Sequence, residues 1–476
     1  MSEHCGYVVQ INELHPHSNA DRLQVAVIFS QNVIVDLNTK VGDLGVFFPV
    51  DLQLSEEYCE KNNLVRRKDE YGNNVGGYLD LDKRNIRAMK LRGEKSEGLF
   101  MPLESLAYTG ETKFEVGEKI EMLNGHEICR KYIPKTQNRC GYVTEGNHTR
   151  KKSVPLAPLF AEHADTEQLI YNMEAFKPGD QIEITLKIHG TSGRTGYLPK
   201  FQGYKRTFWD KIFRREGTPI YDWGYVTGTR RVVLHDFEEG GYYGSNSFRA
   251  PHAKFFEGKL HKGETVYYEI VGFTTEGSPI MASVANSKIS DKEFTKQYGK
   301  ETVFSYGCDP KGGGTADTPE ELNVTPQSAC YVYRMTMTNE DGDVVEYTPD
   351  FMRYRCEQMG AKCVPVMAKV FTCDNADGNV VISAFEQNGG AYGNGGPASN
   401  LGEYIKDIAE RYYDGPDPIG KTHVREGVVI RIVNRPKFCA YKHKNFSFKV
   451  LEGIAKDLAA APDMEEAQDL IEEDNG

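Results

Sequence analysis

The segment 186–192, Leu-Lys-Ile-His-Gly-Thr-Ser, contains a lysine whose setting suits covalent chemistry. Residues typical of a strand precede Lys187, and Gly190 follows it, so we expect the lysine at a strand end beside a sharp turn. A lysine held beside other cations can lose its proton and act as a nucleophile. Alone, the segment is typical of a surface lysine before a turn. The segments that follow it in the chain favour a functional role for Lys187.

Further segments with charged or aromatic side chains follow in order at 227–231, 266–272, 331–334 and 425–431, and the run 441–444 closes the series. They supply Arg230, Glu269, Tyr333, Glu426, Lys442 and Lys444. Each has a structural alternative. Glu269 could be an edge-strand carboxylate and Tyr333 a core residue, and the two lysines could form one solvated strand face, since alternate residues share a face. Their joint occurrence favours a single site.

These segments resemble the nucleotidyltransferase motifs of the covalent nucleotidyltransferase superfamily, which includes DNA ligases, RNA ligases and mRNA capping enzymes. His189 stands where most of the superfamily has Asp, and this feature and the run 442–445 are similar to RNA ligases of type 2. An OB-like module before the catalytic domain, with none after it, resembles the type 5 RNA ligases. The resemblance covers most of residues 5–450 and implies an ATP-dependent RNA ligase.

The resemblance implies three displacements at phosphorus. Lys187 attacks ATP to form lysyl-AMP, AMP passes to an RNA 5′-phosphate, and the RNA 3′-hydroxyl then expels AMP. Positioning and charge neutralisation dominate such steps. An ordinary lysine, with a pKa near 10.4, is protonated at neutral pH. We expect Lys442, Lys444 and a bound Mg²⁺ (or Mn²⁺) to lower the pKa of Lys187, because nearby cations disfavour a further positive charge.

The resemblance also suggests a role for each remaining residue. Glu426 is expected in the metal shell because hard cations take carboxylate oxygens, and Glu269 is expected at the ribose hydroxyls. The site list is completed by Tyr333 stacked on adenine, Lys442 and Lys444 at the α-phosphate, and Arg230 at the ribose or 5′-phosphate, with Arg231 as the rival. His189 would donate a hydrogen bond to a phosphate or to the RNA end, and a core histidine is its alternative.

The elements that position these residues suggest an α+β chain. Short strands with Gly and Pro between them predict an OB-type β-barrel over 1–125, and the runs 14–23 and 90–99 resemble the tRNA-binding type of OB fold. A basic linker is expected at 126–158, an ATP-grasp-like nucleotidyltransferase domain of antiparallel sheets and helices at 159–455, and an acidic tail at 456–476. Strands are predicted at 181–187, 195–198, 224–227, 265–271, 329–336, 427–432 and 446–450. Helices are predicted near 290–298 and 401–413, with an insertion at 274–327 and a mobile loop at 388–400.

Composition narrows the setting. The chain has 476 residues and a net charge of −12, but residues 457–476 carry eight acids, while 130–152 carry seven bases against one acid. Local basic stretches, rather than total charge, set phosphate affinity. No apolar run reaches 18 residues, the N-terminus lacks the pattern of a secretory signal, and the ten cysteines lack zinc-site spacing. We therefore expect a cytoplasmic monomer with reduced cysteines and no membrane partner, acting on RNA.

Three functions remain open at this point. The first is an RNA ligase that joins 3′-hydroxyl and 5′-phosphate ends, at nicks or other duplex ends, as in RNA repair. The second is a GTP-dependent capping-type nucleotidyltransferase, although those enzymes carry the OB domain after the catalytic part. The third is a non-catalytic protein that binds RNA ends, against which stands the joint presence of Lys187, Glu269, Glu426, Lys442 and Lys444.

Overall fold

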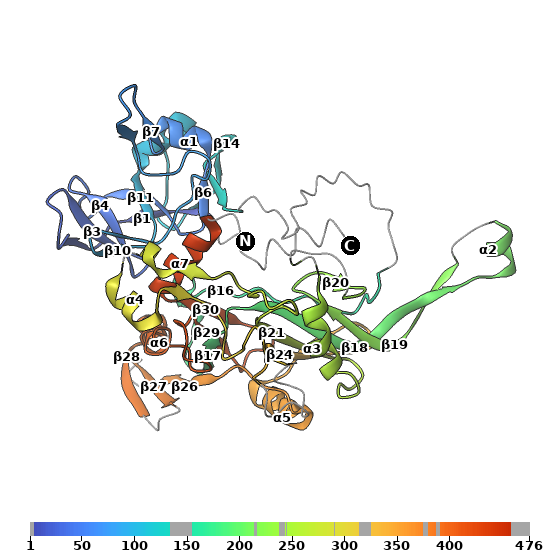
Figure 1. The fold of residues 1–476 in the computed structure, drawn as a ribbon. Helices are drawn as coiled ribbons and strands as arrows, with labels where there is room; N and C mark the ends of the chain where they lie inside the picture. The colour runs from blue at the N-terminus through green and yellow to red at the C-terminus, as the bar shows by residue number, and fades with distance from the viewer. Residues whose placement is uncertain are drawn as a thin grey trace. The chain divides into compact units, whose positions relative to one another are not determined.

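The computed structural model describes residues 4–133, 155–213, 217–237, 243, 245–289, 291–313, 325–374, 379–386 and 391–457. The chain forms two units (Figure 1). The first comprises Met1–Pro134 and Lys444–Asp457, and the second comprises Lys135–His443 and Leu458–Gly476. The expected acidic tail beyond Asp457 and most of the expected linker lie outside the described residues.

The first unit is built from short strands around an apolar core. Its elements are β1 (Gly6–Gln10), β2 (Leu14–Pro16), β3 (Leu23–Ile28), β4 (Gln31–Asp36), β5 (Leu44–Phe48), β6 (Leu52–Leu54), α1 (Glu56–Lys61), β7 (Arg66–Lys68), β8 (Asn74–Gly76), β9 (Met89–Leu91), β10 (Glu94–Ser96), β11 (Leu99–Pro102), β12 (Lys119–Ile120), β13 (Met122–Leu123), β14 (His126–Glu127), β15 (Cys129–Lys131) and α7 (Phe446–Asp457). The main sheet has the order β11-β5-β1-β12, and β2-β3-β4 form a meander. Val8, Val46, Phe48 and Tyr58 belong to an apolar core in which the main sheet packs with α1.

Two features of this unit differ from the sequence expectation. The strand predicted at 446–450 is wrong, because these residues begin the helix α7. Asn445 caps that helix, its side-chain oxygen accepting a hydrogen bond from the backbone N–H of Phe448 at 2.8 Å. The alternation Phe-Ser-Phe gave a strand-like pattern that the cap overrides. The start of the expected linker is also ordered, since β15 pairs with β6.

The second unit contains two large sheets whose strands are mostly antiparallel. Its elements are β16 (Glu167–Gln168), β17 (Gln181–Lys187), β18 (Thr191–Lys205), α2 (Phe208–Ile212), β19 (Thr218–Gly228), β20 (Val233–Leu234), α3 (Ala250–Phe255), β21 (Glu264–Gly272), β22 (Val284–Ala285), α4 (Lys292–Tyr298), β23 (Glu301–Thr302), β24 (Ser328–Thr338), β25 (Val344–Glu346), α5 (Pro349–Met359), β26 (Val366–Asp374), β27 (Asn379–Glu386), β28 (Ala391–Pro397), α6 (Leu401–Glu410), β29 (Gly427–Ile432) and β30 (Ala440–Lys444), whose last residue groups with the first unit.

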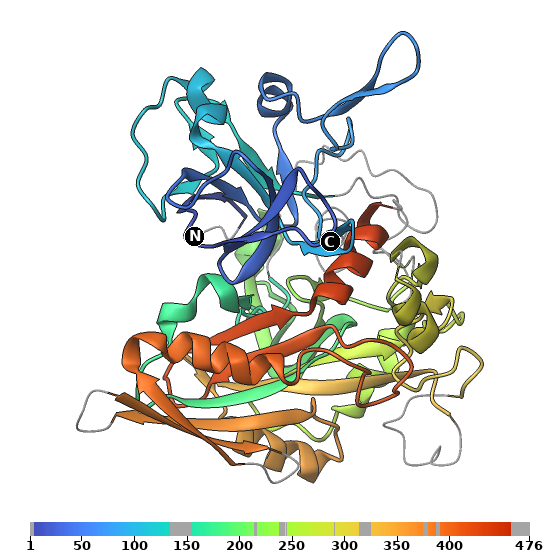
Figure 2. The ribbon, with the colours of Figure 1, turned by 90° about the vertical axis from the view of Figure 1, so that its left-hand side faces the viewer.

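One sheet has the order β16-β30-β29-β17-β26-β27-β28, and the other has the order β20-β19-β18-β21-β24-β25. β17 and β18 are consecutive in the chain but belong to different sheets, so the turn 188–190 crosses from one sheet to the other. The strands β26, β27 and β28 and the helix α6 lie together in the lower part of Figure 2.

The sequence located most of these elements. The predicted strands 181–187 and 427–432 match β17 and β29 at both ends, and the helix predicted near 290–298 is α4. The expected mobile loop at 388–400 contains the strand β28 instead, which pairs with β27. The described part of the chain contains no helix long and apolar enough to cross a membrane.

Candidate active site

Lys187 is the last residue of β17, and the strand register sets it opposite Gly427, the first residue of β29. Glu426, directly before β29, is thereby brought to the same edge of the sheet. The Lys187 Nζ lies 2.9 Å from Glu426 Oε1. The lysine side chain is 20% exposed while that of Glu426 is 1% exposed, so the lysine can be reached by a ligand although its acidic partner is buried.

His189 lies in the same turn and faces the same carboxylate. Its Nδ1 is 3.7 Å from Glu426 Oε2, and its side chain is 19% exposed. Its backbone N–H donates a hydrogen bond of 2.7 Å to the hydroxyl of Tyr306. The structure therefore brings two of the predicted site residues, Lys187 and His189, against a third, Glu426.

Gly190 joins the turn to Glu269 of β21. Its backbone N–H donates to Glu269 Oε1 at 3.1 Å, and the carboxylate is buried in a strand whose nine residues are all buried. A Cβ at position 190 would lie 2.3 Å from the carbonyl oxygen of Ile270. Only glycine allows the backbone to approach the neighbouring strand this closely.

The insertion 274–327 supplies a wall of the site that the sequence did not reveal. The ring of Phe304 lies 4.6 Å from the ring of His189, edge to face, and Tyr306 accepts the hydrogen bond described above. Burial, together with the nearby carboxylate of Asp417, raises the pKa of Tyr306 well above its ordinary value, so its hydroxyl stays protonated. Alternating aromatic residues at 304 and 306 were the available signal, but nothing in the sequence linked them to Lys187.

His423 extends this wall, its ring contacting those of both Phe304 and Tyr306. The rings of His423 and Tyr306 are 4.4 Å apart, edge to face, and the histidine is fully buried. Burial lowers the pKa of His423, which favours the neutral imidazole. The wall therefore presents neutral rings behind the charged turn.

The two lysines of the run 441–444 differ in their surroundings. Lys442 lies in β30, paired in parallel with Gln168 of β16, and β30 neighbours β29 in the sheet. Lys444, at the end of β30, has its Nζ 2.8 Å from Glu452 of α7. The ammonium of Lys444 is thus neutralised by a carboxylate within the first unit.

Arg230 and Tyr333 contact a segment before β17, residues 163–165. Arg230 pairs with Asp165, with 2.6 Å between Nη2 and Oδ1, and its side chain is 15% exposed, against 48% for Arg231. The ring of His163 lies 5.3 Å from that of Tyr333. Burial would raise the pKa of Asp165, but the Arg230 guanidinium outweighs it and lowers that pKa below its ordinary value. Arg230 and Tyr333, which are both predicted to contact the nucleotide, therefore each have a side-chain partner in the segment 163–165.

The carboxylates around the turn 188–190 suit a cation that keeps most of its bound water. Among the described residues, no group of three or more His, Cys, Asp or Glu could hold a metal ion. Two buried carboxylates, Glu426 and Glu269, nevertheless contact the same turn. Mg²⁺ is commonly held by one or two carboxylates together with water and substrate phosphates, so these residues suit a divalent metal that arrives with a nucleotide.

Comparisons with known proteins agree with this architecture. An OB-fold domain family model matches residues 6–103. Structures of mutant Naegleria gruberi RNA ligase, one with ATP and Mn and another with AMP and Mn, are similar to this chain with a TM-score of 0.50 and 15% sequence identity; the first match covers 94% of this chain and 97% of that one, and the second 94% and 98%. No curated protein matches the sequence.

The fold is thereby defined as an N-terminal OB-fold module followed by an α+β domain of the RNA-ligase type. The predicted fold class, and the predicted resemblance to RNA ligases that carry an OB module in front, are confirmed at the level of fold. The roles of the individual site residues stay predictions.

Proposed function

We propose that this chain is an ATP-dependent RNA ligase that joins a 3′-hydroxyl to a 5′-phosphate through lysyl-AMP and RNA-adenylate intermediates. The observation that carries the proposal is the contact of 2.9 Å between Lys187 Nζ and Glu426 Oε1 at the end of β17. It combines an accessible amine with a buried carboxylate that is placed to accept a proton from it. The similar Naegleria structures contain ATP or AMP with Mn, which supports the same ligands here.

In the first step the Lys187 amine attacks the α-phosphorus of ATP. A nitrogen–phosphorus bond forms, the bond to the bridging oxygen breaks, and pyrophosphate leaves. The lysine must lose protons for this, and the adjacent Glu426 carboxylate is placed to accept one. A divalent metal, Mg²⁺ or Mn²⁺, would be held by Glu426 with Glu269 nearby and would neutralise phosphate charge when bound.

The other residues position the nucleotide. Glu269 already accepts the Gly190 N–H with one oxygen, and we propose that its second oxygen accepts a ribose hydroxyl. We assign the α-phosphate to Lys442 and Lys444, the adenine to Tyr333, and the ribose or 5′-phosphate to Arg230. His189 would donate to a phosphate of the nucleotide or RNA end. The partners would be RNA with nicked or other end-bearing duplexes.

The test is covalent labelling. We expect wild-type protein to acquire label from α-³²P-ATP with Mg²⁺ or Mn²⁺, and Lys187→Ala to acquire none. Lys369→Ala is the matched control, since Lys369 lies on the neighbouring strand β26 and is also paired with a carboxylate, at 2.8 Å from Asp350. Competition by unlabelled ATP but not GTP separates a ligase from a capping enzyme.

Absence of label on the wild-type protein would contradict the proposal, as would a label that survives Lys187→Ala. RNA binding without any label would favour the non-catalytic alternative. Sealing of nicked duplexes with RNA or DNA strands would then define the substrate.

A further inference from the structure

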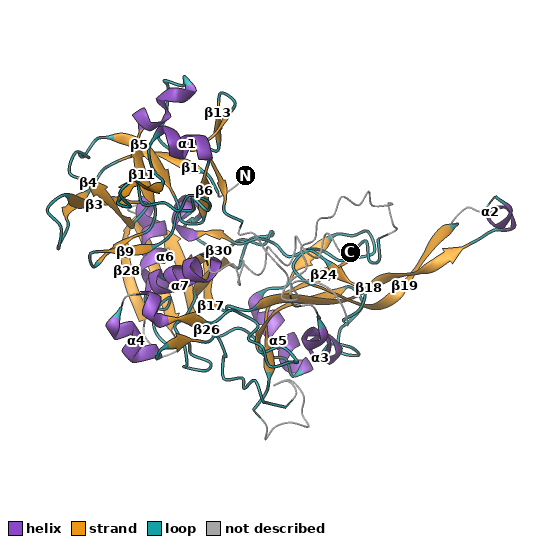
Figure 3. Cartoon of the chain, turned by 45° about the horizontal axis from the view of Figure 1, so that its top comes forward, coloured by secondary structure: helices purple, strands orange, loops and turns teal. Residues whose placement is uncertain are grey.

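The hairpin β18–β19 extends well beyond the sheet that carries it (Figures 1 and 3). β18 pairs with β21 only from Thr191 to Gly196, whereas its pairing with β19 continues to Lys205. Residues 197–205 and 218–225, with α2 between the strands, are called the arm below. At roughly 3.3 Å per residue, the strand part from 197 to 205 is about 30 Å long.

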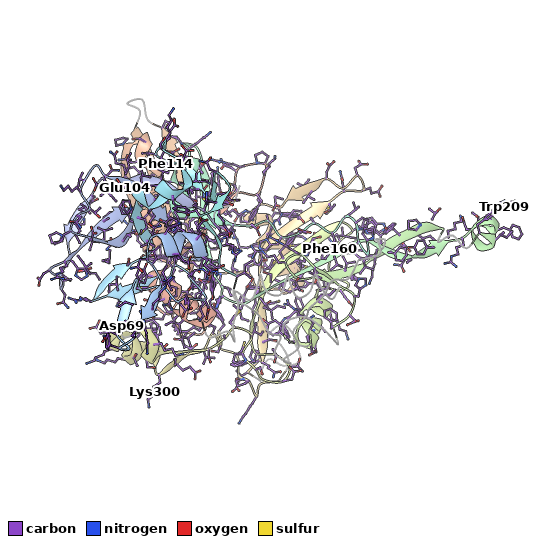
Figure 4. The ribbon with its side chains drawn as sticks, turned by 90° about the horizontal axis from the view of Figure 1, so that it is seen from above. Asp69, Glu104, Phe114, Phe160, Trp209 and Lys300 are labelled. Carbon is purple, nitrogen blue, oxygen red and sulfur yellow. The ribbon has the colours of Figure 1, made fainter. Side chains whose placement is uncertain are left out.

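The end of the arm carries a cluster of large apolar side chains. Phe208, Trp209, Ile212 and Phe213 are 72%, 64%, 52% and 61% exposed. The rings of Trp209 and Phe213 are stacked, with centroids 6.0 Å apart and an angle of 18° between planes. Figure 4 shows Trp209 at the far end of the arm. Soluble proteins seldom expose such a cluster unless it binds something.

The cluster is held in place by a short capped helix. Thr207 accepts a hydrogen bond from the backbone N–H of Asp210, and the Asp210 carboxylate accepts one from the backbone N–H of Thr207. This reciprocal capping box fixes the start of α2. The exposed rings are therefore presented on a defined turn of helix.

One face of the arm continues the aromatic surface toward the sheet. Cross-strand pairs join Tyr197 to Tyr225, Pro199 to Trp223 and Phe201 to Tyr221. Alternate residues of a strand share a face, so these six side chains line one side of the arm, and all are partly exposed. The rings of Tyr197 and Tyr225 are stacked at 4.7 Å. A ladder of rings thus leads from the sheet to the tip.

The charge of the arm is opposite to that of the whole protein. Among its described residues, the arm contains four bases, Lys200, Lys205, Arg206 and Lys211, against two acids, Asp210, which is used in the cap, and Asp222. Lys205 and Arg206 are exposed where the strand meets the tip. Because the whole chain carries −12, this local positive charge indicates an anionic partner.

We propose that the arm binds single-stranded RNA, with unpaired bases stacked on the exposed rings and phosphates near Lys205 and Arg206. Rings interleaved with basic residues are the general means of holding single strands without sequence preference, and paired bases offer no free face for such stacking. The choice of RNA rests on the proposed function. The bound nucleotides would be an unpaired flank of the end to be joined.

The chain allows a direct test, because its two tryptophans, Trp209 and Trp223, both lie in the arm. In the Trp223→Phe variant, emission reports on the tip alone. We expect saturable quenching of this emission by a single-stranded oligoribonucleotide, weaker quenching by a blunt duplex, and a roughly tenfold loss of RNA affinity in Phe208→Ala, measured by anisotropy. Lys205→Ala should reduce the slope of log affinity against log salt by about 0.7.

Tyr354→Ala is the matched control, since this α5 residue is also aromatic and 54% exposed but lies outside the arm. Labelling by ATP without RNA should be equal in wild-type, Phe208→Ala and control proteins. Quenching without labelling would leave the arm proposal intact while the ligase proposal failed. The arm proposal is overturned by unchanged RNA affinity in Phe208→Ala, by protein self-association that accounts for the emission change, or by emission that responds to anionic vesicles but not to RNA.

Discussion

Replacing Gly190 by alanine tests whether the turn geometry sets the rate of lysine adenylation. The added Cβ would lie 2.3 Å from the carbonyl oxygen of Ile270 and 2.9 Å from Glu269 Cγ. An ordinary contact between carbon and oxygen is about 3.3 Å, so the turn must retreat by about 1 Å. A displacement of this size costs about 100-fold in rate when it misplaces a reacting group, which equals about 2.7 kcal/mol at 1.36 kcal/mol per tenfold.

The assay is single-turnover formation of the protein–AMP label from labelled ATP, with thermal unfolding measured in parallel. We expect Gly190→Ala to remain folded, because the clash is local, and to form label about 100-fold more slowly than wild type. Gly224→Ala is the control, since a Cβ there would meet only the flexible side chains of Lys200 and Gln202, at 3.3 Å or more.

A rate within threefold of wild type would refute the reasoning, because it would show that the path of the turn does not limit the reaction. A Gly190→Ala variant that labels slowly only because it is unfolded would show a matching loss of the thermal transition. Comparison of the two readouts at the same temperature separates these outcomes.

The remaining predictions concern groups next to the site and in the core. Tyr306→Phe removes the acceptor of the His189 N–H, and we expect a tenfold or smaller loss of labelling rate, about 1 kcal/mol, with one pyrophosphate still released per label. Glu264→Gln leaves the buried guanidinium of Arg355, which donates two hydrogen bonds of 2.8 Å to it, without its carboxylate, so unfolding by urea should show a loss of about 3–5 kcal/mol. Burial would raise the pKa of Glu264, but Arg355 lowers it below the ordinary 4.5. The pair therefore stabilises the fold above about pH 4.5. The difference in unfolding free energy between wild type and Glu264→Gln should become smaller as the pH falls below that value.

Each of these predictions has a result that contradicts it. Equal labelling by wild type and Tyr306→Phe would show that this hydrogen bond does not position His189. A stability gap at Glu264 that widened on acidification would mean that the carboxylate has a raised pKa, opposite to the sign given by its pairing with Arg355.

The sequence predicted the strands that carry the nucleophile because their patterns are unambiguous. β17 alternates Ile182, Ile184 and Leu186 with polar residues, β29 is rich in β-branched residues, and the predicted and observed ends of both strands coincide. The association of Lys187 with Glu426 follows from this register. It is a contact between residues far apart in sequence, and it was predicted only through the order of the motifs.

Other features depend on tertiary contacts that no local pattern records. Tyr306 lies in an insertion, and only folding brings it to His189. The choice between Arg230 and Arg231 was open because strand alternation does not apply to residues beyond the end of β19. Both arginines reach Asp165, and they differ in burial, the Arg230 side chain being 15% exposed and that of Arg231 48%.

The contact between Lys187 and Glu426 gives this carboxylate a second place in the proposed chemistry. From the sequence, neighbouring cations were expected around the amine, and Glu426 was expected in the metal shell. The structure places the Glu426 carboxylate 2.9 Å from the Lys187 Nζ, and Lys444 is paired with Glu452. The same carboxylate is therefore placed to accept a proton from the proposed nucleophile as well as to hold a cation, which is how the proposed first step uses it.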